Sequence, residues 1–336
     1  FTFYTTTKQE TTMRPIAKSI TLALALAGGI AAPLAQAQAW PTKQVRIIVA
    51  APAGSAPDIA ARAIADKLGA TWGQMPVIDN KPGAGCGIAI DQARAAPADG
   101  YTLVMPQAAC VVVSPLTYKT FKSDIDKDFV ALSLVAVSPM LIVANEKAPA
   151  KNLAEMIAYA KANPEKMTVG NPTRTSIPHL ASELIAQQTG AKIFQVSFST
   201  TGQAITAVVG GDVMFNVDGA PPLLPLVKAG KLRAIAVMAD KVLPGLEGIP
   251  LAKDTVPGLE VNGWFMMMAP KGLPAAIATK INDDINKALV QPDVIARFAG
   301  FGTYPRPGSL ADADAFLKKE AGVWSKVIKA AGIQAE

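Results

Sequence analysis

The sequence predicts an α/β protein in which strands alternate with helices. Half of the 336 residues are hydrophobic and only 17% are charged, so the chain can bury cores for two domains. Short β-rich apolar runs recur, and most are followed by a loop of small or polar residues and then by an amphipathic helix. This alternation favours parallel sheets whose ligand-binding edge lies at the carboxyl ends of the strands.

The first 39 residues are set apart from the fold. Residues 1–12 precede the first methionine and are interpreted as an upstream artefact. Residues 13–39 have a basic start, an apolar segment at 21–30 and two small-x-small cleavage motifs, which together indicate a secretory signal peptide. We expect an exported, soluble protein of the Gram-negative periplasm whose mature chain begins near Gln38 or Trp40.

Composition excludes several function classes. The formal net charge of +6 is spread along the chain without a run of lysine or arginine, so nucleic acid is not an expected partner. Two cysteines and a single histidine, His179, are too few for a zinc site, and we expect neither metal nor cofactor. Cys86 and Cys110 either pair in an oxidising compartment or remain two buried thiols, and the sequence leaves both open.

The first βα unit contains the first candidate binding loop. A buried strand is predicted at 45–49 and a helix at 59–68, joined by a loop of small residues. Such a loop leaves backbone N–H groups free at a helix N-terminus, where they favour an anion, here a carboxylate. The alternative is an ordinary βα turn, in which Ser55 or Asp58 caps the helix and Pro57 suits its first turn. The candidate binding residues are Ala51, Ala53, Gly54, Ser55, Ala56, Pro57 and Asp58.

Two further units follow in the same half of the chain. Strand 75–79 leads into a glycine-rich loop and a helix at 88–96, and strand 101–105 comes next. The glycine spacing matches a dinucleotide fingerprint poorly, so the loop is interpreted as a second backbone-lined binding loop. Its candidate residue is Gly85, and the loop after strand 101–105 adds Gln107 and Ala108.

The first crossing into a second domain is predicted between the apolar runs 132–137 and 140–144. This domain repeats the opening design, because strand 167–170 leads through a hydroxyl-rich loop into the helix at 179–189. The candidates here are Arg174, a five-donor group suited to carboxylate, with Thr175, Ser176 and His179. The remaining elements are helix 153–162, strand 193–196, helix 203–209, strand 213–217, helix 223–229, strand 232–238, a return strand at 261–268 and the helices 274–289 and 311–330. Trp264, Trp324 and the methionine run 266–268 are expected in the core.

Several motifs, in order, resemble the solute-binding proteins of tripartite tricarboxylate transporters, also called Bug receptors. They are Trp40-Pro41 with Val45-Arg-Ile-Ile-Val, Pro52-Ala-Gly54 with Asp58, Asn80-Lys-Pro-Gly-Ala-Gly85, Pro97-Ala-Asp-Gly-Tyr-Thr-Leu103, His179-Leu-Ala-Ser-Glu-Leu184, Lys228-Ala-Gly-Lys-Leu-Arg-Ala234 and Trp264-Phe265 with Ala269-Pro270. The resemblance covers essentially the whole mature chain.

The resemblance implies a two-domain periplasmic-binding-protein fold of the Venus flytrap type. Each domain is then a mainly parallel sheet flanked by helices, with two crossing strands as the hinge. Domain 1 would comprise residues 40–140 and 262–336, and domain 2 residues 141–261. The family's ligand-binding positions fall on residues 53–58 and on Thr175, Ser176, Phe198, Ser199, Thr200 and Asp218. The implied partners are a small carboxylate and the subunits of a membrane transporter, with the receptor itself a monomer.

Departures from the family pattern concern the ligand. Ala51 stands where the family usually has phenylalanine, which leaves room for a bulkier ligand. Phe198-Ser199-Thr200 replaces Tyr-Lys-Gly, which removes a phenol and a cation. Arg174 stands where the family usually has Gly or Asn. These changes favour an aromatic or otherwise bulky carboxylate, including dicarboxylates, over aspartate, glutamate or citrate.

Other functions were weighed against this one. The same receptor could serve an ABC importer or a sensor system, which the receptor sequence does not exclude. A secreted hydrolase would need a nucleophile and a base, and Ser176 lies only three residues before His179. Asp58 and Asp218 could form an acid–base pair only if the fold brings them together. Catalysis is therefore not expected.

Overall fold

The computed structural model describes residues 1–7, 40–164 and 166–335. The predicted signal peptide, 13–39, lies outside these residues. The chain divides into two compact units, 1–42 and 43–336.

The described residues of the first unit contain no helix or strand, and a cis peptide bond joins Trp40 to Pro41. Every element described below belongs to the second unit.

Parallel strands form the first part of the second unit, as predicted. β1 lies between β2 and β3 and pairs with both in parallel, so the carboxyl ends of all three strands meet at one edge. β9 and β10 join this group through antiparallel pairs. We call it the first strand set: β2 (Val77–Asn80), β1 (Arg46–Val49), β3 (Thr102–Met105), β9 (Asn262–Pro270), β4 (Phe129–Ala144) and β10 (Tyr304–Pro305).

The second strand set shares β4 with the first. β5 pairs in parallel with both β6 and β7, while β7 and β8 flank the last residues of β4. Residues 129–139 of β4 pair with β9, and residues 140–144 pair with β7. One strand thus belongs to both sets. The second set comprises β6 (Phe194–Phe198), β5 (Thr168–Pro172), β7 (Phe215–Gly219), β4 and β8 (Arg233–Val237).

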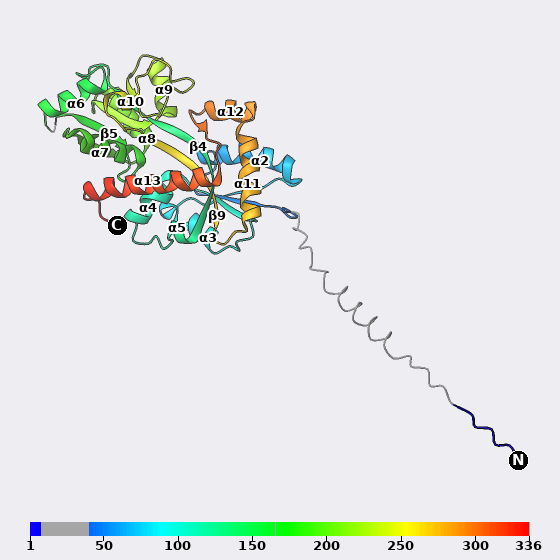
Figure 1. Cartoon of the computed structure of the whole chain (residues 1–336). Coiled ribbons are helices and arrows are strands. Elements are labelled where there is room, and N and C mark those ends of the chain that lie inside the picture. The colour runs from blue at the N-terminus through cyan, green and yellow to red at the C-terminus, as the bar shows by residue number, and fades with distance from the viewer. Residues whose placement is uncertain (8–39, 165, 336) are drawn as a thin grey trace. The chain divides into compact units, whose positions relative to one another are not determined.

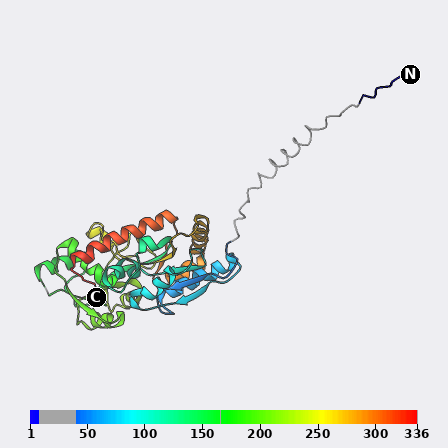
Figure 2. The same cartoon turned by 90° about the horizontal axis from the view of Figure 1, so that it is seen from below.

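Helices cover both strand sets (Figures 1 and 2). α2, α11 and α12 pack together beside the first set, and the long C-terminal helix α13 lies along β4 and also contacts α7 of the second set. The helices are α2 (Ala56–Trp72), η1 (Ala84–Cys86), α3 (Gly87–Arg94), the π-helical η2 (Ala109–Val113), α4 (Ser114–Thr117), α5 (Ile125–Asp128), α6 (Leu153–Ala162), α7 (Ile177–Thr189), α8 (Thr201–Gly210), α9 (Ala220–Lys228), α10 (Ala252–Thr255), α11 (Ala275–Leu289), α12 (Pro292–Ala299) and α13 (Leu310–Ala330).

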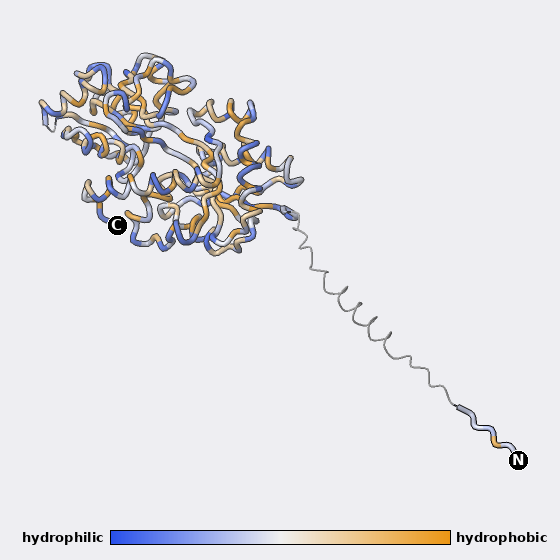
Figure 3. The backbone as a smooth tube through the Cα atoms, in the orientation of Figure 1, coloured by the Kyte–Doolittle hydropathy of each residue, from blue (hydrophilic) through white to orange (hydrophobic). Residues whose placement is uncertain are grey.

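The core is built from the apolar runs that predicted the strands. Figure 3 shows hydrophobic and hydrophilic stretches alternating along the backbone of the second unit. Trp264, Trp324 and Met266–Met268 are buried, which confirms the prediction that they pack in the core. Both indoles donate to one Oε2 of Glu320, at 2.9 and 3.0 Å, so the polar edge of each ring is satisfied.

Several short elements escaped the sequence prediction. η2, α4 and α5 fill the segment after β3, and α12 precedes the two-residue strand β10. The run at 110–113 is β-branched and uniformly apolar, so its pattern carries no helical period. In the structure these valines are buried between α4 and α13, and tertiary packing decides the conformation.

The cysteines form a disulfide. Cys86 and Cys110 are joined with their Cα atoms 5.4 Å apart, so the alternative of two free buried thiols is wrong. Neither thiol's partner could be read from the sequence, because the contact depends on how the loops after β2 and β3 pack. The bridge ties η1 to η2 at the carboxyl edge of the first strand set.

Removing this bridge is expected to destabilise the fold without abolishing it. The double variant C86A/C110A loses about 3 kcal/mol of unfolding free energy, because a closed loop spanning 24 residues restricts the unfolded chain. Urea titrations of the wild type with and without reductant, beside the variant, measure this loss. Identical midpoints in all three samples would contradict it.

Candidate functional site

The loop before α2 is the first part of the candidate site. Gly54 has φ +78° and lies in the open, and its N–H donates to Asp58 Oδ2 at 2.9 Å. Ser55 is the N-cap residue, but its hydroxyl donates to the Pro52 carbonyl instead of capping the helix. Among the described residues, the backbone N–H groups of Ala53 and Ala56 have no hydrogen-bond partner. These two donors remain for an anion.

Asp58 holds this loop through hydrogen bonds of its carboxylate. Its buried carboxylate pairs with Arg62 at 3.0 Å, and Arg62 also donates to Asn80 Oδ1. Burial raises the pKa of Asp58, but hydrogen bonds from Arg62 and the Gly54 N–H outweigh it and hold the pKa below its usual value. Asn80 in turn donates to the Ala51 carbonyl at 3.0 Å. Asp58 and Ala51 are therefore occupied within the protein, and Pro57 is buried beside them.

The loops after β2 and β3 meet beside it. Gly85 has φ +57°, and a Cβ placed there would lie 2.7 Å from the Tyr118 ring, so only glycine fits beneath this tyrosine. Gln107 forms a backbone bridge to Phe265, and Ala108 is buried. Of the three residues predicted here, Gly85 lies against a side chain that the sequence analysis did not consider.

The loop between β5 and α7 is conformationally strained. Thr173 and Thr175 have φ of +25° and +69°, a region that β-branched residues rarely adopt. The loop is held by the Thr173 N–H, which donates to the Phe198 carbonyl at 2.7 Å, and by the Ser176 N–H, which donates to the Thr173 carbonyl at 3.2 Å. Such strain persists only where the surroundings impose it, and it is frequent at ligand-binding loops.

Ser176 and His179 do not form a catalytic pair. The Ser176 hydroxyl donates to the Pro172 carbonyl at 2.6 Å and accepts the His179 backbone N–H at 3.3 Å, so it caps α7. The His179 ring is buried, and its Nδ1 has no partner among the described residues. Burial lowers the pKa of His179 to about 4, with a further contribution from the charge of Arg174. The imidazole is therefore neutral at physiological pH.

The end of β6 faces a shallow surface pocket. Phe198, Ser199 and Thr200 line it together with residues of α8. Thr200 caps α8 by accepting the Gln203 N–H at 3.3 Å, and the Ser199 N–H donates to Gln203 Oε1 at 3.1 Å. Like Ser176, Thr200 thus has a structural role that the alternation of strand, loop and helix already indicates.

Asp218 ends β7 in a buried position. Oδ1 accepts the Gly219 N–H at 2.7 Å, while Oδ2 is buried without a hydrogen-bond partner among the described residues. Burial raises the pKa of Asp218 to about 6, against the lowering effect of the Gly219 N–H. It is one of two unpartnered buried groups among the predicted site residues, the other being His179.

One pocket contains predicted residues together with residues the sequence analysis missed. Arg174 and Thr175 line a pocket of about 400 Å³ whose other walls come from two distant segments. These are Thr117, Tyr118 and Lys119 at the end of α4 and just after it, and Gly332, Ile333, Gln334 and Ala335 after α13. No motif marks either segment. The segment 332–335 reaches the pocket because of the way in which α13 packs.

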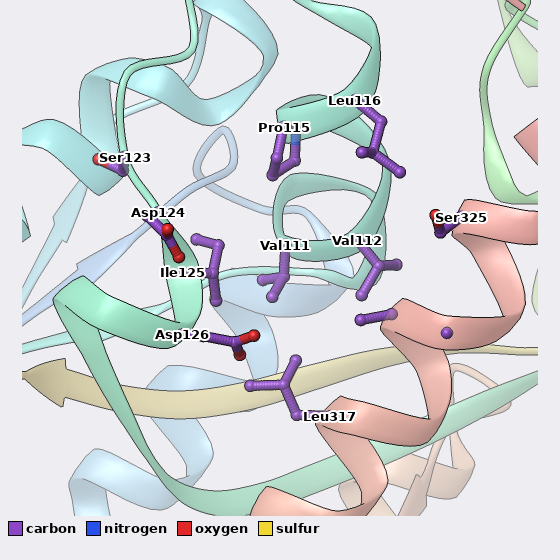
Figure 4. A pocket seen from close by; sticks show the side chains of 12 residues that line it. Val111, Val112, Pro115, Leu116, Ser123, Asp124, Ile125, Asp126, Leu317 and Ser325 are labelled. Atoms are coloured by element: carbon purple, nitrogen blue, oxygen red, sulfur yellow. The ribbon is translucent and has the colours of Figure 1, made fainter. Parts of the chain in front are cut away.

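A second pocket, of about 550 Å³, lies apart from the predicted residues (Figure 4). Aliphatic side chains from η2, α4 and α13 form its walls, and Asp124 and Asp126 stand at its rim. Asp124 is paired with Lys127 at 2.7 Å. None of the predicted site residues lines this pocket.

No helix in the described ranges is both long enough and apolar enough to cross a membrane. Within the same ranges, no three acidic, histidine or cysteine side chains are grouped so as to hold a metal ion.

The fold and the loops at the strand ends define a class, the solute-binding proteins. A family described as the tripartite tricarboxylate transporter family receptor matches residues 60–333. The chain therefore belongs to this family, which confirms the resemblance seen in the sequence. It is a family of receptors and not of enzymes.

Individual relatives agree with this assignment. The chain is 30% identical to the protein BugT of Bordetella pertussis over 306 residues, covering 90% of this chain and 94% of BugT. R. palustris Rpa4515, solved with adipate, superimposes with a TM-score of 0.73 at 32% identity, covering 88% of this chain and all of that one. MatC from Rhodopseudomonas palustris, with bound malate, gives 0.68 at 28% identity, covering 86% of this chain and all of that one.

The depressed pKa of His179 predicts a stability loss in acid. The folded state binds the proton less well than the unfolded chain, so stability is full above about pH 6.5 and falls as pH drops toward 4. His179→Gln should flatten this dependence. Urea midpoints at pH 4, 5.5 and 7 measure it, and an unchanged pH slope in the variant would show that His179 is not its source.

Asp218 predicts the opposite sign. Its folded pKa is raised, so the stability it contributes is full below about pH 3.8 and is lost as pH rises through 6. Asp218→Asn should therefore be more stable than the wild type at pH 8, and this advantage should vanish at pH 4. Thermal unfolding at the two pH values decides the matter; a variant less stable at pH 8 contradicts the prediction.

Proposed function

We propose that the chain is a periplasmic receptor that captures a small carboxylate between two domains and delivers it to a tripartite membrane transporter. The domains we propose are residues 40–140 with 262–336, and residues 141–261. The observation that carries the carboxylate is the loop before α2, where the N–H groups of Ala53 and Ala56 lack partners at a helix N-terminus. The bound adipate and malate of two relatives support this ligand class.

The mechanism we propose is closure by population shift. A ligand that contacts both domains stabilises the closed form only by its extra contacts in that form. The loop before α2 supplies one side, and the loop containing Arg174 and Thr175 supplies the other. Since β4 runs through both strand sets, it and β9 are the proposed hinge.

The ligand panel that tests this function contains aliphatic monoacids and diacids, tricarboxylates, amino acids, benzoate- and phthalate-type aromatics and neutral controls. At a hundredfold excess over its Kd, a true ligand stabilises the protein by about 2.7 kcal/mol, which thermal unfolding detects readily. Calorimetry confirms each hit. A neutral compound that binds while every acid fails would overturn the carboxylate assignment.

Gly54→Val tests the loop itself. A valine side chain would stand over the free N–H groups, so carboxylate binding should be lost while the fold survives. The matched control is Gly73→Val at the far end of α2, because Gly73 has a similar φ of +72° and equally open surroundings. Both variants carry a strain of about 1–2 kcal/mol. Equal affinity in Gly54→Val and Gly73→Val would place the anion elsewhere.

A further inference from the structure

The aliphatic pocket of Figure 4 has the size and the lining of a small-molecule site. Its volume of about 550 Å³ lies within the range of about 300–1,000 Å³ that is usual for such sites, which are mostly apolar with a few polar groups. Leu116, in the lining, is 41% exposed. Four further aliphatic side chains of the lining are each 8% exposed or less, namely Val111, Val112, Ile125 and Leu317.

Small residues on α13 make room for this pocket. Ala321, Gly322 and Ser325 line it from the helix. A Cβ built on Gly322 would meet no atom within 4 Å, so no close contact requires glycine at this position. Since glycine is the poorest helix former after proline, helix formation does not account for its place inside α13 either. What the glycine provides is open space above the buried aliphatic side chains.

The charge of the pocket is negative. Its twelve lining residues include two carboxylates and no cation. Asp124 is already paired, because it contacts Lys127 Nζ at 2.7 Å and accepts the Lys127 N–H at 3.3 Å. Asp126 is exposed, and its carboxylate takes part in no ion pair among the described residues. In Figure 4 its side chain extends toward the middle of the pocket, between Val111 and Leu317.

Two other lysines near Asp126 also leave its carboxylate available. Lys271 donates to the backbone carbonyl of Asp126 at 3.5 Å and not to the side chain. Lys318 pairs with Asp314 at 2.7 Å. Its pKa is raised mainly by the hydrogen bond to Asp314, with the charge of Asp126 a smaller contribution. An unpaired carboxylate in an aliphatic pocket without cations favours a positively charged ligand and disfavours an anion.

We propose that this pocket is a binding site for a small aliphatic amine, whose alkyl chain packs on the buried aliphatic side chains and whose ammonium group pairs with Asp126. Each methylene group gains free energy as it leaves water, while the ammonium group remains hydrated beside an exposed carboxylate. None of the predicted carboxylate-binding residues lines the pocket. The inference therefore goes beyond the proposed receptor function and does not depend on it.

Methyl-resolved NMR, with propyl-, butyl-, pentyl- and hexylammonium as probes, tests the site. The methyl signals of Val111, Val112, Ile125 and Leu317 should shift during each titration. Affinity should rise about fourfold for each added methylene group, which is the gain expected for a buried methylene. 1-Hexanol should shift the same signals with about threefold lower affinity than hexylammonium, because it lacks the charge.

Asp126→Asn removes the charge and keeps the shape of the side chain. It should lower hexylammonium affinity about threefold and leave 1-hexanol affinity unchanged, since an exposed ion pair contributes modestly. The matched control is Asp283→Asn on α11. Asp283 is likewise exposed and outside the ion pairs of the described residues, but it does not line the pocket. The control should bind hexylammonium as the wild type does.

Gly322→Leu fills the pocket by placing a side chain in its open space. Because leucine is a better helix former than glycine and no atom obstructs its Cβ, thermal unfolding should show a variant at least as stable as the wild type. Binding of both hexylammonium and 1-hexanol should be lost. Ala315→Leu is the control, since Ala315 is an exposed residue of the same helix that does not line the pocket.

Three results would overturn the proposal. Methyl shifts confined to other parts of the protein, or unchanged hexylammonium affinity in Gly322→Leu, would mean that the amine binds elsewhere. Equal affinities for 1-hexanol and hexylammonium, with no change in Asp126→Asn, would show an apolar pocket without preference for a cation. The carboxylate panel decides the receptor function separately, so failure of either proposal leaves the other standing.

Discussion

The two sets of strands that carry the candidate loops are joined by one strand that is hydrogen-bonded into both. β4 pairs with β9 over residues 129–139 and with β7 over 140–144, so any movement of one set relative to the other must bend or twist this strand. Its pairing with β9 shifts register twice, between Ala131 and Ser133 and between Leu134 and Ala136. Such irregularities bend a strand locally and increase its twist, which suits the hinge that we propose for β4.

The parallel strands determine where the candidate ligand-binding loops lie. The loops after β1, β2 and β3 meet at one edge, and the loops after β5, β6 and β7 meet at another. At these edges many polar side chains already have hydrogen-bond partners within the protein. Ser176 and Thr200 cap helices, and Asp58 accepts a backbone N–H of its own loop. Among the residues that the structure describes, the groups left for a ligand at these edges include backbone N–H groups, the cation Arg174 and the buried Asp218 and His179.

The sequence was sufficient for the fold, and it named loops at the strand ends as the candidate site, which stays a prediction. Apolar runs ending in small or hydroxyl residues predicted the strands and the loops after them, and Arg174 was recognised as a cation in such a loop. Tyr118 and Lys119 were missed because η2 interrupts the pattern with a buried, aperiodic run of valines. The segment 332–335 could not be predicted either, since its position depends on where the far end of α13 lies. The disulfide likewise depends on a packing distance and not on spacing.

The disulfide also makes the two sides of the site unequal. On the first strand set, a covalent bond fixes η1 to η2, and Tyr118 rests on the loop so fixed. On the second, the strained turn at 173–175 is held only by hydrogen bonds, two of them to Phe198 and Thr173 carbonyls. A ligand at this site would therefore contact a covalently fixed loop on the first strand set and a loop held only by hydrogen bonds on the second. A change of residues in the strained turn therefore need not disturb the loop that the disulfide fixes.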